Sequence, residues 1–301
     1  MSVLTFATRP SKLARWQTQF IIQVLQKAWP DLICREAVIT TRGDRILDRP
    51  LPEIGGKGLF TEELERALLN GRVDAAVHSL KDLPVENTPG LMVGMIPKRA
   101  EAADVLISPN GHTLSNLPDG AIVGTSSLRR QAQLLAYRPD FKIQSLRGNV
   151  DTRVRKVEQG NYNAIILASA GVTRLGLDSH ITQRLPFEIM LPAPGQGALA
   201  VQCRANDQET LKLLSALEDA NTRVAVNAER DFLAALGGGC SLPVGAYATL
   251  RGTEYRMQAV VATVDGREIH RVYGKGNDPI RLGRELAQQA IGRGALELLH
   301  V

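Results

Sequence analysis

The chain has 301 residues, of which 44% are hydrophobic and 22% charged, an ordinary globular composition that is long enough for two or three domains. It holds no apolar run of membrane-spanning length, and its first residues lack the charged start and apolar core of a signal segment, so we expect a cytoplasmic protein without a membrane partner. Its three cysteines are far apart, which argues against a disulfide framework, and no metal-type spacing is present.

The basic residues carry the clearest compositional signal. The net charge is +5, and 27 of the 36 basic residues are arginine. An excess of arginine over lysine suits bidentate binding of carboxylate or phosphate groups. Nucleic acid is the alternative partner, but the arginines are dispersed along the chain, aromatic residues are only 4%, and no nucleic-acid motif is present. We therefore expect a small anionic ligand and no nucleic-acid partner.

A strand followed by a helix begins the chain. Residues 3–8 have the composition of a strand, and the apolar residues of 11–28 recur at helical spacing. Arg9 and Ser11 stand at the junction, with Ser11 as the expected N-cap. Ligands of open α/β sheets bind at the carboxyl ends of strands, and helix N-termini favour anions. Both residues are therefore candidate anion-binding residues, the alternative for Arg9 alone being a solvated surface charge.

A long connection follows the second predicted strand, which we place at 35–41. Residues 42–60 are rich in glycine and proline and are too long for a plain connector. We interpret them as a mobile lid that carries Lys57, the alternative being a disordered surface loop. Thr61 then opens a helix that ends at Gly71.

A buried strand is predicted at 73–80, and Lys81 and Asp82 follow it directly. Asp82 therefore also falls at the carboxyl end of a strand. A carboxylate at that place can stabilise a developing cation or transfer protons. The alternative is an aspartate that caps a turn.

The same arrangement of strand, basic residues and helix recurs in the middle of the chain. We place strands there at 91–96, 105–107, 121–125, 142–146 and 164–168. Ser126 and Ser127 cap a helix whose first turn holds Arg129 and Arg130, which oppose the helix dipole unless an anion lies at that N-terminus. The alternative is a solvated charge pair. The other strand-end basic residues of this part are Arg147, Arg153 and Arg174, the last in a helix that begins at 171–175.

The last third of the chain changes character after a hinge-like segment. Residues 191–197, which include Gln196, are rich in proline and glycine, and 198–203 could return as a strand to the first domain. An α+β unit with a small antiparallel sheet follows, because an Asp-Gly pair between strand patterns predicts a hairpin. Its expected elements are a helix at 221–236, strands at 244–250, 255–264 and 268–274, and a helix at 280–299 interrupted near 292–294.

A single thiol lies on a glycine-rich loop of this unit. Three glycines at 237–239 leave the backbone nearly free in φ, and Cys240 follows at once. A thiol on such a loop can point into a cleft and carry a group. The alternative is a loop cysteine beside a flexible turn.

Several of these segments, taken in order, resemble the porphobilinogen deaminase family over essentially the whole chain. The segments that carry the resemblance are Thr8–Ser11, Gly55–Phe60, His78–Pro84, Gly124–Arg130, Leu146–Arg153 and Gly238–Cys240. Each is weakly specific alone, but the full ordered set is highly specific. No position that the family uses for chemistry departs from its pattern.

The resemblance implies an α/β fold with three domains. The first two would be similar to periplasmic binding proteins, with a cleft between them and a hinge that the chain crosses twice. The third would be a small α+β domain with a three-stranded antiparallel sheet. We place the first domain at 1–98 and 198–216, the second at 99–197 and the third at 217–301. The family also suggests a monomer.

The resemblance further implies a transferase of porphyrin and heme biosynthesis, the hydroxymethylbilane synthase activity. Four units of porphobilinogen would be joined head to tail with loss of ammonia, and a linear tetrapyrrole would be released by hydrolysis. Cys240 would hold a dipyrromethane cofactor through a thioether, Asp82 would be catalytic, and no metal is implied. The other cofactor contacts would be Lys81, Asp82, Thr125, Ser126, Ser127, Arg129, Arg130, Arg147 and Gly148. The substrate contacts would be Arg9, Ser11, Lys57, Arg147, Arg153, Arg174 and Gln196.

Two other functions stay open on the sequence alone. A two-domain anion-binding module without catalysis explains the strand-end arginines but gives Cys240 and Asp82 no role. An intact mass about two linked pyrrole units above that of the chain separates the enzyme from this module. A nucleic-acid binder, the second alternative, predicts an affinity that falls steeply with salt and no consumption of porphobilinogen.

Overall fold

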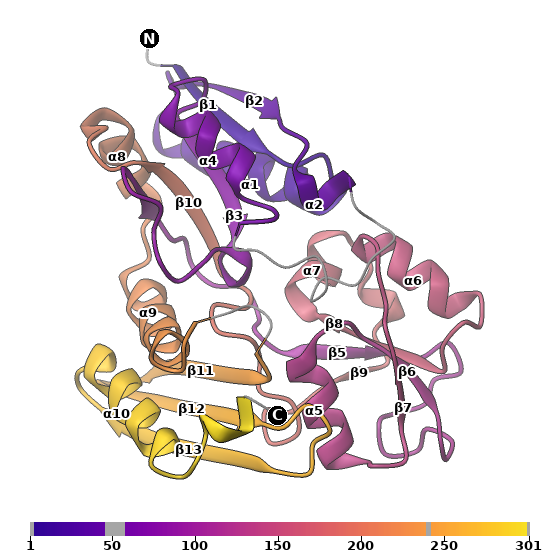
Figure 1. Ribbon diagram of the computed structural model, residues 1–301. Coiled ribbons are helices and arrows are strands. Elements are labelled where there is room, and N and C mark those ends of the chain that lie inside the picture. Colours follow the sequence, from indigo (N-terminus) through magenta and orange to yellow (C-terminus); the bar gives the residue numbers. More distant parts are fainter. Residues whose placement is uncertain (1–2, 46–57, 239–241, 300–301) are drawn as a thin grey trace.

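The computed structural model describes residues 3–45, 58–238 and 242–299, which build three units around three separate sheets (Figure 1). In Figure 1 the first sheet lies at the top, the second at the lower right and the third at the lower left. The chain enters the second unit from the first, returns to the first, and then continues into the third.

The first sheet has five strands, of which two neighbouring parallel strands end beside each other. Its strands are β1 (Val3–Thr8), β2 (Ile33–Val38), β3 (Ala75–Ser79), β4 (Leu91–Met95) and β10 (Leu199–Arg204). Their order is β2-β1-β3-β10-β4, with β1 parallel to β2 and β3, and β10 antiparallel to β3 and β4. Because β1 and β3 are parallel neighbours, the residues that follow them meet at one edge of the sheet.

Helices cover this sheet, and the first is capped as its sequence predicts. They are α1 (Lys12–Ala28), α2 (Arg42–Arg45), α4 (Glu62–Leu69) and α8 (Gln208–Leu214), with the 3₁₀ turns η1 (Leu80–Asp82) and η3 (Ser215–Leu217). The Ser11 hydroxyl accepts a hydrogen bond from the Ala14 N–H, which satisfies one of the free donors at the start of α1. Ile21 and Leu25 of α1 are fully buried in one cluster with Phe6 of β1.

The second sheet repeats this plan. Its strands are β5 (Asp104–Ile107), β6 (Ile122–Gly124), β7 (Lys142–Gln144), β8 (Ala164–Ala168) and β9 (Gln183–Arg184). The order is β7-β6-β8-β5-β9, with β6 parallel to β7 and β8, and β5 antiparallel to β8 and β9. The accompanying helices are α5 (Leu128–Tyr137), α6 (Val150–Glu158) and α7 (Ser169–Arg174), with the 3₁₀ turn η2 (Asp178–His180).

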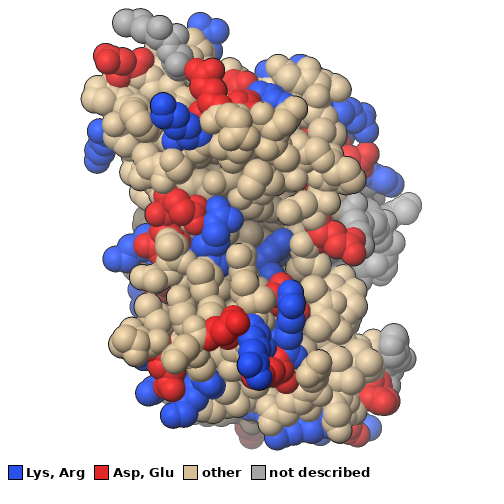
Figure 2. Space-filling model, turned by 90° about the vertical axis from the view of Figure 1, so that its left-hand side faces the viewer, with Lys and Arg blue, Asp and Glu red and all other residues tan. Residues whose placement is uncertain are grey.

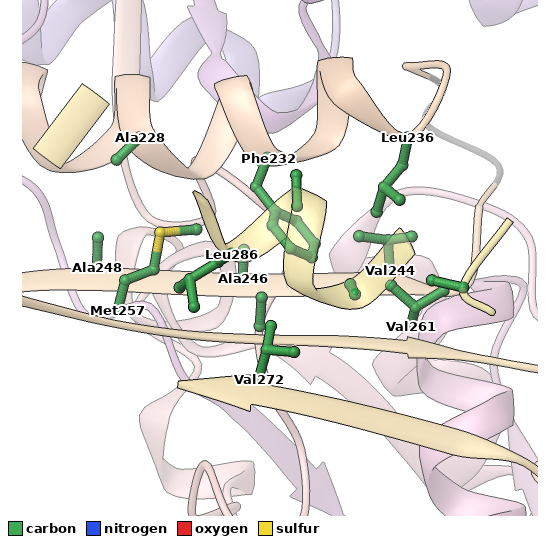
Figure 3. Close-up of a cluster of buried hydrophobic side chains, with 14 of the residues drawn as sticks. Ala228, Phe232, Leu236, Val244, Ala246, Ala248, Met257, Val261, Val272 and Leu286 are labelled. Carbon is green, nitrogen blue, oxygen red and sulfur yellow. The ribbon is translucent and has the colours of Figure 1, made fainter. Parts of the chain in front are cut away.

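The third unit packs two helices on one face of a three-stranded antiparallel sheet. Its elements are α9 (Ala220–Ala235), β11 (Val244–Arg251), β12 (Glu254–Ala262), β13 (Ile269–Gly276), α10 (Pro279–Ile291) and the 3₁₀ turn η4 (Glu297–Leu299). Phe232 of α9 is fully buried and points toward the sheet, where Ala246 and Val244 lie beneath it (Figure 3). Met257 and Leu286 belong to the same cluster.

The expected fold class is confirmed: two α/β units with a hinge crossover, followed by a small α+β unit with a three-stranded antiparallel sheet. The division at 1–98 with 198–216, 99–197 and 217–301 stays a prediction. No helix in the described ranges is long and apolar enough to cross a lipid bilayer.

Some element bounds differ from the sequence-based expectation. The second strand is Ile33–Val38 and not 35–41, because it pairs in register with β1 from Val3 onward. The helix expected to begin at 171–175 instead begins at Ser169 and ends at Arg174. The connection expected at 42–60 begins with α2, and its residues 46–57 lie outside the described part. The last helix ends at Ile291, and a short 3₁₀ turn follows it. Sequence reasoning also missed α8 and β9, both short.

Candidate active site

A cavity of about 430 Å³ lies between the first and second units, at the edge where their strands end. Its walls come from segments far apart in sequence, which the two sheets bring together. Its basic lining residues are Arg9, Lys81, Arg130, Arg147, Arg153 and Arg174, and its acidic ones are Asp44, Asp82 and Asp151. Basic groups thus outnumber acidic ones two to one among the described lining residues, which favours an anionic occupant.

The wall from the first unit is built on the ends of β1 and β3. Arg9 follows β1, pairs with Asp44 of α2, and lies over the Phe60 ring at 4.2 Å from its centroid. Burial alone would raise the pKa of Asp44, but the hydrogen bonds from Arg9 and Thr41 hold it below its ordinary value. This carboxylate therefore stays ionised and fixes the direction of the Arg9 side chain.

Lys81 and Asp82 lie in η1, immediately after β3, and both line the cavity. The Lys81 ammonium donates to the Gln196 side-chain oxygen at 3.3 Å. Burial lowers the pKa of Lys81 to about 8, and the Asp82 carboxylate partly opposes this effect. The Asp82 carboxylate forms no hydrogen bond or ion pair with any other residue in the described ranges, so it stays available to a ligand.

The wall from the second unit holds the adjacent arginines at the start of α5. Both are buried, and both donate to one carboxylate, that of Asp104 at the start of β5. Burial opposes ionisation of Asp104, but the two guanidinium groups hold its pKa well below its ordinary value. Arg130 lines the cavity, whereas Arg129 does not. The anion that we expected at this helix start is therefore, in part, a carboxylate of the chain itself.

A second helix start on this wall carries Arg147, Gly148 and Arg153. Gly148 has a φ of +114°, where a side chain would be strained and would meet Thr152 at 3.0 Å, so the turn needs a glycine. The Arg153 Nε donates to the Gly148 carbonyl at 2.7 Å and so ties the helix to the turn. Burial, together with repulsion from Arg130 and Arg147, lowers the pKa of Arg153 to about 10.

Arg174 closes the cavity at the end of α7. Its Nη2 donates to the Gly197 carbonyl at 2.8 Å, and its guanidinium lies 5.8 Å from the Trp16 ring centroid. Burial lowers the pKa of Arg174 to about 10. Neither Arg153 nor Arg174 has a carboxylate within 4.0 Å in the part of the chain that the structure describes. Half-buried guanidinium groups without a counter-ion favour an anion supplied from outside.

Besides Arg129, four of the expected contact residues do not line the cavity. The Thr125 and Ser127 side chains accept backbone N–H groups at the start of α5, and the Ser126 hydroxyl bonds both Leu146 backbone groups. Gln196 is fully buried in the hinge, behind the cavity, and the substrate contact that we expected from it stays a prediction. Its side-chain nitrogen donates to the Ala102 carbonyl and to Asp104, and its side-chain oxygen accepts from Lys81.

Two expected residues, Cys240 and Lys57, lie outside the described residues. The neighbours of Cys240 that the structure describes are Gly238 and Leu242. A side chain placed on Gly238 would come within 2.8 Å of Val85, so the start of this loop packs against the segment that follows Asp82.

Sequence reasoning missed Asp44, Asp104, Asp151, Phe60 and Gln17. Gln17 lines the cavity with its side chain buried, and it donates to the Ser79 hydroxyl at 2.9 Å. Asp44 and Phe60 fall in the connection that we interpreted as a lid. Asp104 offered a signal, because a lone carboxylate at the start of an apolar strand requires a buried partner.

Comparison with known proteins gives matches along almost the whole chain. Residues 4–212 match the family described as "Porphobilinogen deaminase, dipyromethane cofactor binding domain", and residues 223–292 match "Porphobilinogen deaminase, C-terminal domain". The chain is 51% identical to the porphobilinogen deaminase of Brevibacillus brevis over 293 residues, covering 97% of this chain and 95% of that protein. It is 50% identical to that of Roseiflexus castenholzii over 297 residues, covering 98% of each.

Similarity to solved structures is more distant. A TRAP periplasmic solute binding protein from Desulfovibrio salexigens aligns with 72% of this chain and 72% of its own, at a TM-score of 0.44 and 12% identity. This likeness is too weak to support any argument about the site.

Proposed function

We propose how the cavity works from one premise, that this chain belongs to the porphobilinogen deaminase family. It is a transferase that joins four porphobilinogen units head to tail on a Cys-linked dipyrromethane cofactor, with loss of ammonia each time. Hydrolysis then releases the linear tetrapyrrole for porphyrin and heme biosynthesis. Family membership thereby removes the alternative of a binding module without catalysis.

The residues of the cavity fit such a group. Each pyrrole unit brings an acetate and a propionate, so the occupant is a polyanion whose charge grows with every addition. Arg153 and Arg174, which line the cavity, have no internal counter-ion in the described ranges. Behind the cavity, the buried Nε of Arg129 has no hydrogen-bond acceptor there. When bound, the cofactor supplies the pyrrole carbon to which the first substrate is joined.

We assign the second-unit wall and η1 to the cofactor. Cys240 holds it through a thioether, and helix α9, which leads to that loop, is docked on the segment around Asp82. The docking runs through Arg230, whose guanidinium donates to the Leu83 and Pro84 carbonyls. The proposed cofactor contacts are Lys81, Asp82, Thr125, Ser126, Ser127, Arg129, Arg130, Arg147 and Gly148.

The substrate carboxylates are assigned to the remaining cations of the cavity. Arg153 and Arg174 bind them directly because their charges are uncompensated, and Arg147 is shared between cofactor and substrate. Arg9 presents its guanidinium at a fixed angle because Asp44 and Phe60 hold it. Ser11 lines the same wall and adds a hydroxyl, and Lys57 remains a proposed contact.

Asp82 is the catalytic carboxylate in this proposal, and one observation carries it. Of the three acidic residues that line the cavity, Asp44 is held by Arg9, and Asp151 is paired with Lys12 at 3.2 Å. Asp82 alone of the three has no such partner in the described ranges. It can therefore bind a pyrrole N–H, stabilise the positive charge left on the substrate when ammonia departs, and accept a proton.

Intact mass spectrometry tests the function. We expect the purified chain to weigh about two linked pyrrole units more than its sequence, and to form a ladder of heavier species when porphobilinogen is added. Cys240→Ser should remove the extra mass, and Cys34→Ser, which changes a half-buried thiol of β2, should keep it. An unmodified parent chain that does not consume porphobilinogen would refute the proposal.

We further propose that the protein acts in the cytoplasm as a monomer, without nucleic acid. On the face seen in Figure 2, basic and acidic side chains are interspersed and form no continuous basic stripe. A continuous basic stripe is typical of proteins that bind nucleic acid. Sedimentation should give a single species of monomer mass. A mobility shift with short duplex DNA at physiological salt would count against this assignment.

A further inference from the structure

One buried carboxylate connects residues of three different segments behind the cavity. Asp104 is fully buried at the start of β5. Its Oδ2 accepts from Arg129 Nη1 at 2.7 Å, and its Oδ1 accepts from Arg130 Nη2 at 2.7 Å and Nε at 3.2 Å. The same Oδ1 accepts from the Gln196 amide at 2.9 Å.

Gln196 carries this connection across the hinge. Its side-chain nitrogen also donates to the Ala102 carbonyl at 2.7 Å, and its side-chain oxygen accepts from Lys81 at 3.3 Å. Its own carbonyl accepts from Arg99 Nε at 2.7 Å. Residues 99 and 102 lie on the outgoing crossing and 196 on the returning one, so this amide bonds both crossings.

We propose that Asp104 is a positioning residue for the condensation reaction, because its carboxylate fixes the Arg129 and Arg130 guanidinium groups and, through Gln196, the Lys81 ammonium. The inference rests on the proposed function, since these three cations are among the proposed contacts of the cofactor. It extends that function to a residue that does not itself line the cavity. The Asp104 carboxylate then sets both the relative position of the two cavity walls and the net charge of the group formed by Lys81, Arg129 and Arg130.

The charge count explains why a carboxylate is needed here. Three cations come together beside the hinge, and a buried cluster of like charges is costly unless an anion is placed among them. Asp104 hydrogen-bonds two of them and reaches the third through an amide that can both donate and accept. A neutral side chain could keep some of these hydrogen bonds but would leave the repulsion uncompensated.

The surroundings of Lys81 make this testable without measuring turnover. Charged groups face it from its own turn (Asp82), from α5 (Arg129 and Arg130) and from β5 (Asp104). Arg230 of α9 lies against the same turn through the Leu83 carbonyl. Among these, the carboxylates raise the pKa of Lys81 and the α5 guanidiniums lower it, in addition to the larger effect of burial.

The experiment measures the pKa of Lys81 by trace acetylation across pH, read by peptide mass spectrometry on the full-length chain. We expect Asp104→Asn to lower this pKa by about one unit and Arg129→Met to raise it. Arg129→Met keeps the Leu191 carbonyl bonded, because the Gln133 amide also donates to it. Asp119→Asn, which removes an exposed carboxylate of the same unit, is the control and should leave the pKa unchanged.

Gln196→Leu tests the bridging step, because it removes the oxygen that accepts from Lys81 and leaves the Asp104–arginine pairs in place. It should also lower the pKa of Lys81. If Asp104→Asn does not fold, the other two variants decide, since a purely structural role would not shift Lys81 in opposite directions. An unchanged pKa of Lys81 in all folded variants would overturn the inference. Failure of the proposed function is separate, because it shows as a parent chain without cofactor mass.

Discussion

Replacing Arg153 with methionine should stabilise the cofactor-free protein and weaken its affinity for carboxylate ligands. The side chain lines the cavity, is half-buried, and has no carboxylate within ion-pair distance in the described ranges. Burial, with repulsion from Arg130 and Arg147, lowers its pKa from the ordinary value of a guanidinium to about 10. A cation with a lowered pKa is less favourable in the folded chain than in the unfolded one, so its charge at neutral pH opposes folding.

The structure gives the size of this effect. One pKa unit is worth about 1.4 kcal/mol, so relief of the whole shift would correspond to about 3 kcal/mol. Water screens part of this at a half-exposed side chain. Methionine also loses the hydrogen bond to the Gly148 carbonyl, which costs about 1 kcal/mol. We expect a net gain of about 1 kcal/mol in the free energy of unfolding.

Urea denaturation in a Cys240→Ser background measures this gain without interference from the cofactor. Arg155→Met, an exposed change on the same helix, is the control and should stay within about 0.5 kcal/mol of the parent. Citrate should raise the melting temperature of the parent more than that of Arg153→Met, because a ligand stabilises the state that binds it. A variant that is less stable than the parent and equally stabilised by citrate would refute the reasoning.

Three other substitutions test separate parts of the argument. Asp82→Asn should keep the cofactor mass and lower kcat by about 10²–10³, and near-parental turnover would exclude the catalytic role. Phe232→Ala should destabilise the third unit by about 3–5 kcal/mol in urea denaturation, because the Phe232 ring fills the cluster in Figure 3. A change below about 1 kcal/mol would show that the cluster collapses into the space that the ring leaves. Gly197→Ala places a side chain 2.6 Å from the Ala100 carbonyl at a φ of +87°. It should cost more stability than the control Gly176→Ala, at a φ of +68° with nothing within 4 Å of the added side chain. Equal losses of stability would show that packing at the hinge adds nothing to the backbone strain.

Much of the cavity could be predicted because its residues follow predictable strands. Arg9 follows β1 and Asp82 follows β3, and parallel neighbours place what comes after them at one edge. Arg147 and Arg153 follow the same logic in the second sheet. These predictions depend only on the order of elements, so small errors in strand bounds do not change them.

The polar groups behind the cavity could not be predicted, because their partners are far apart in sequence. Asp104 is 25 residues from Arg129 and 92 from Gln196, and no local pattern links them. Residue type alone predicts that Gln196 is exposed, since glutamine is usually found at the surface. Its role follows from the two crossings lying side by side, which is a property of the complete fold.

The cations in and behind the cavity therefore divide into two groups, which differ in their effect on stability and on ligand binding. Arg9 is paired with Asp44, and Arg129 and Arg130 share Asp104, so the positions of these three side chains are fixed before any ligand arrives. Arg153 and Arg174 have no such partner in the described ranges, so their desolvation is compensated only when a ligand carboxylate binds. A polyanion that lengthens in steps needs both groups, because a rigid wall keeps its reacting end in place while uncompensated charges accept each new ring. If this division holds, substitutions in the first group will lower stability and those in the second will raise it.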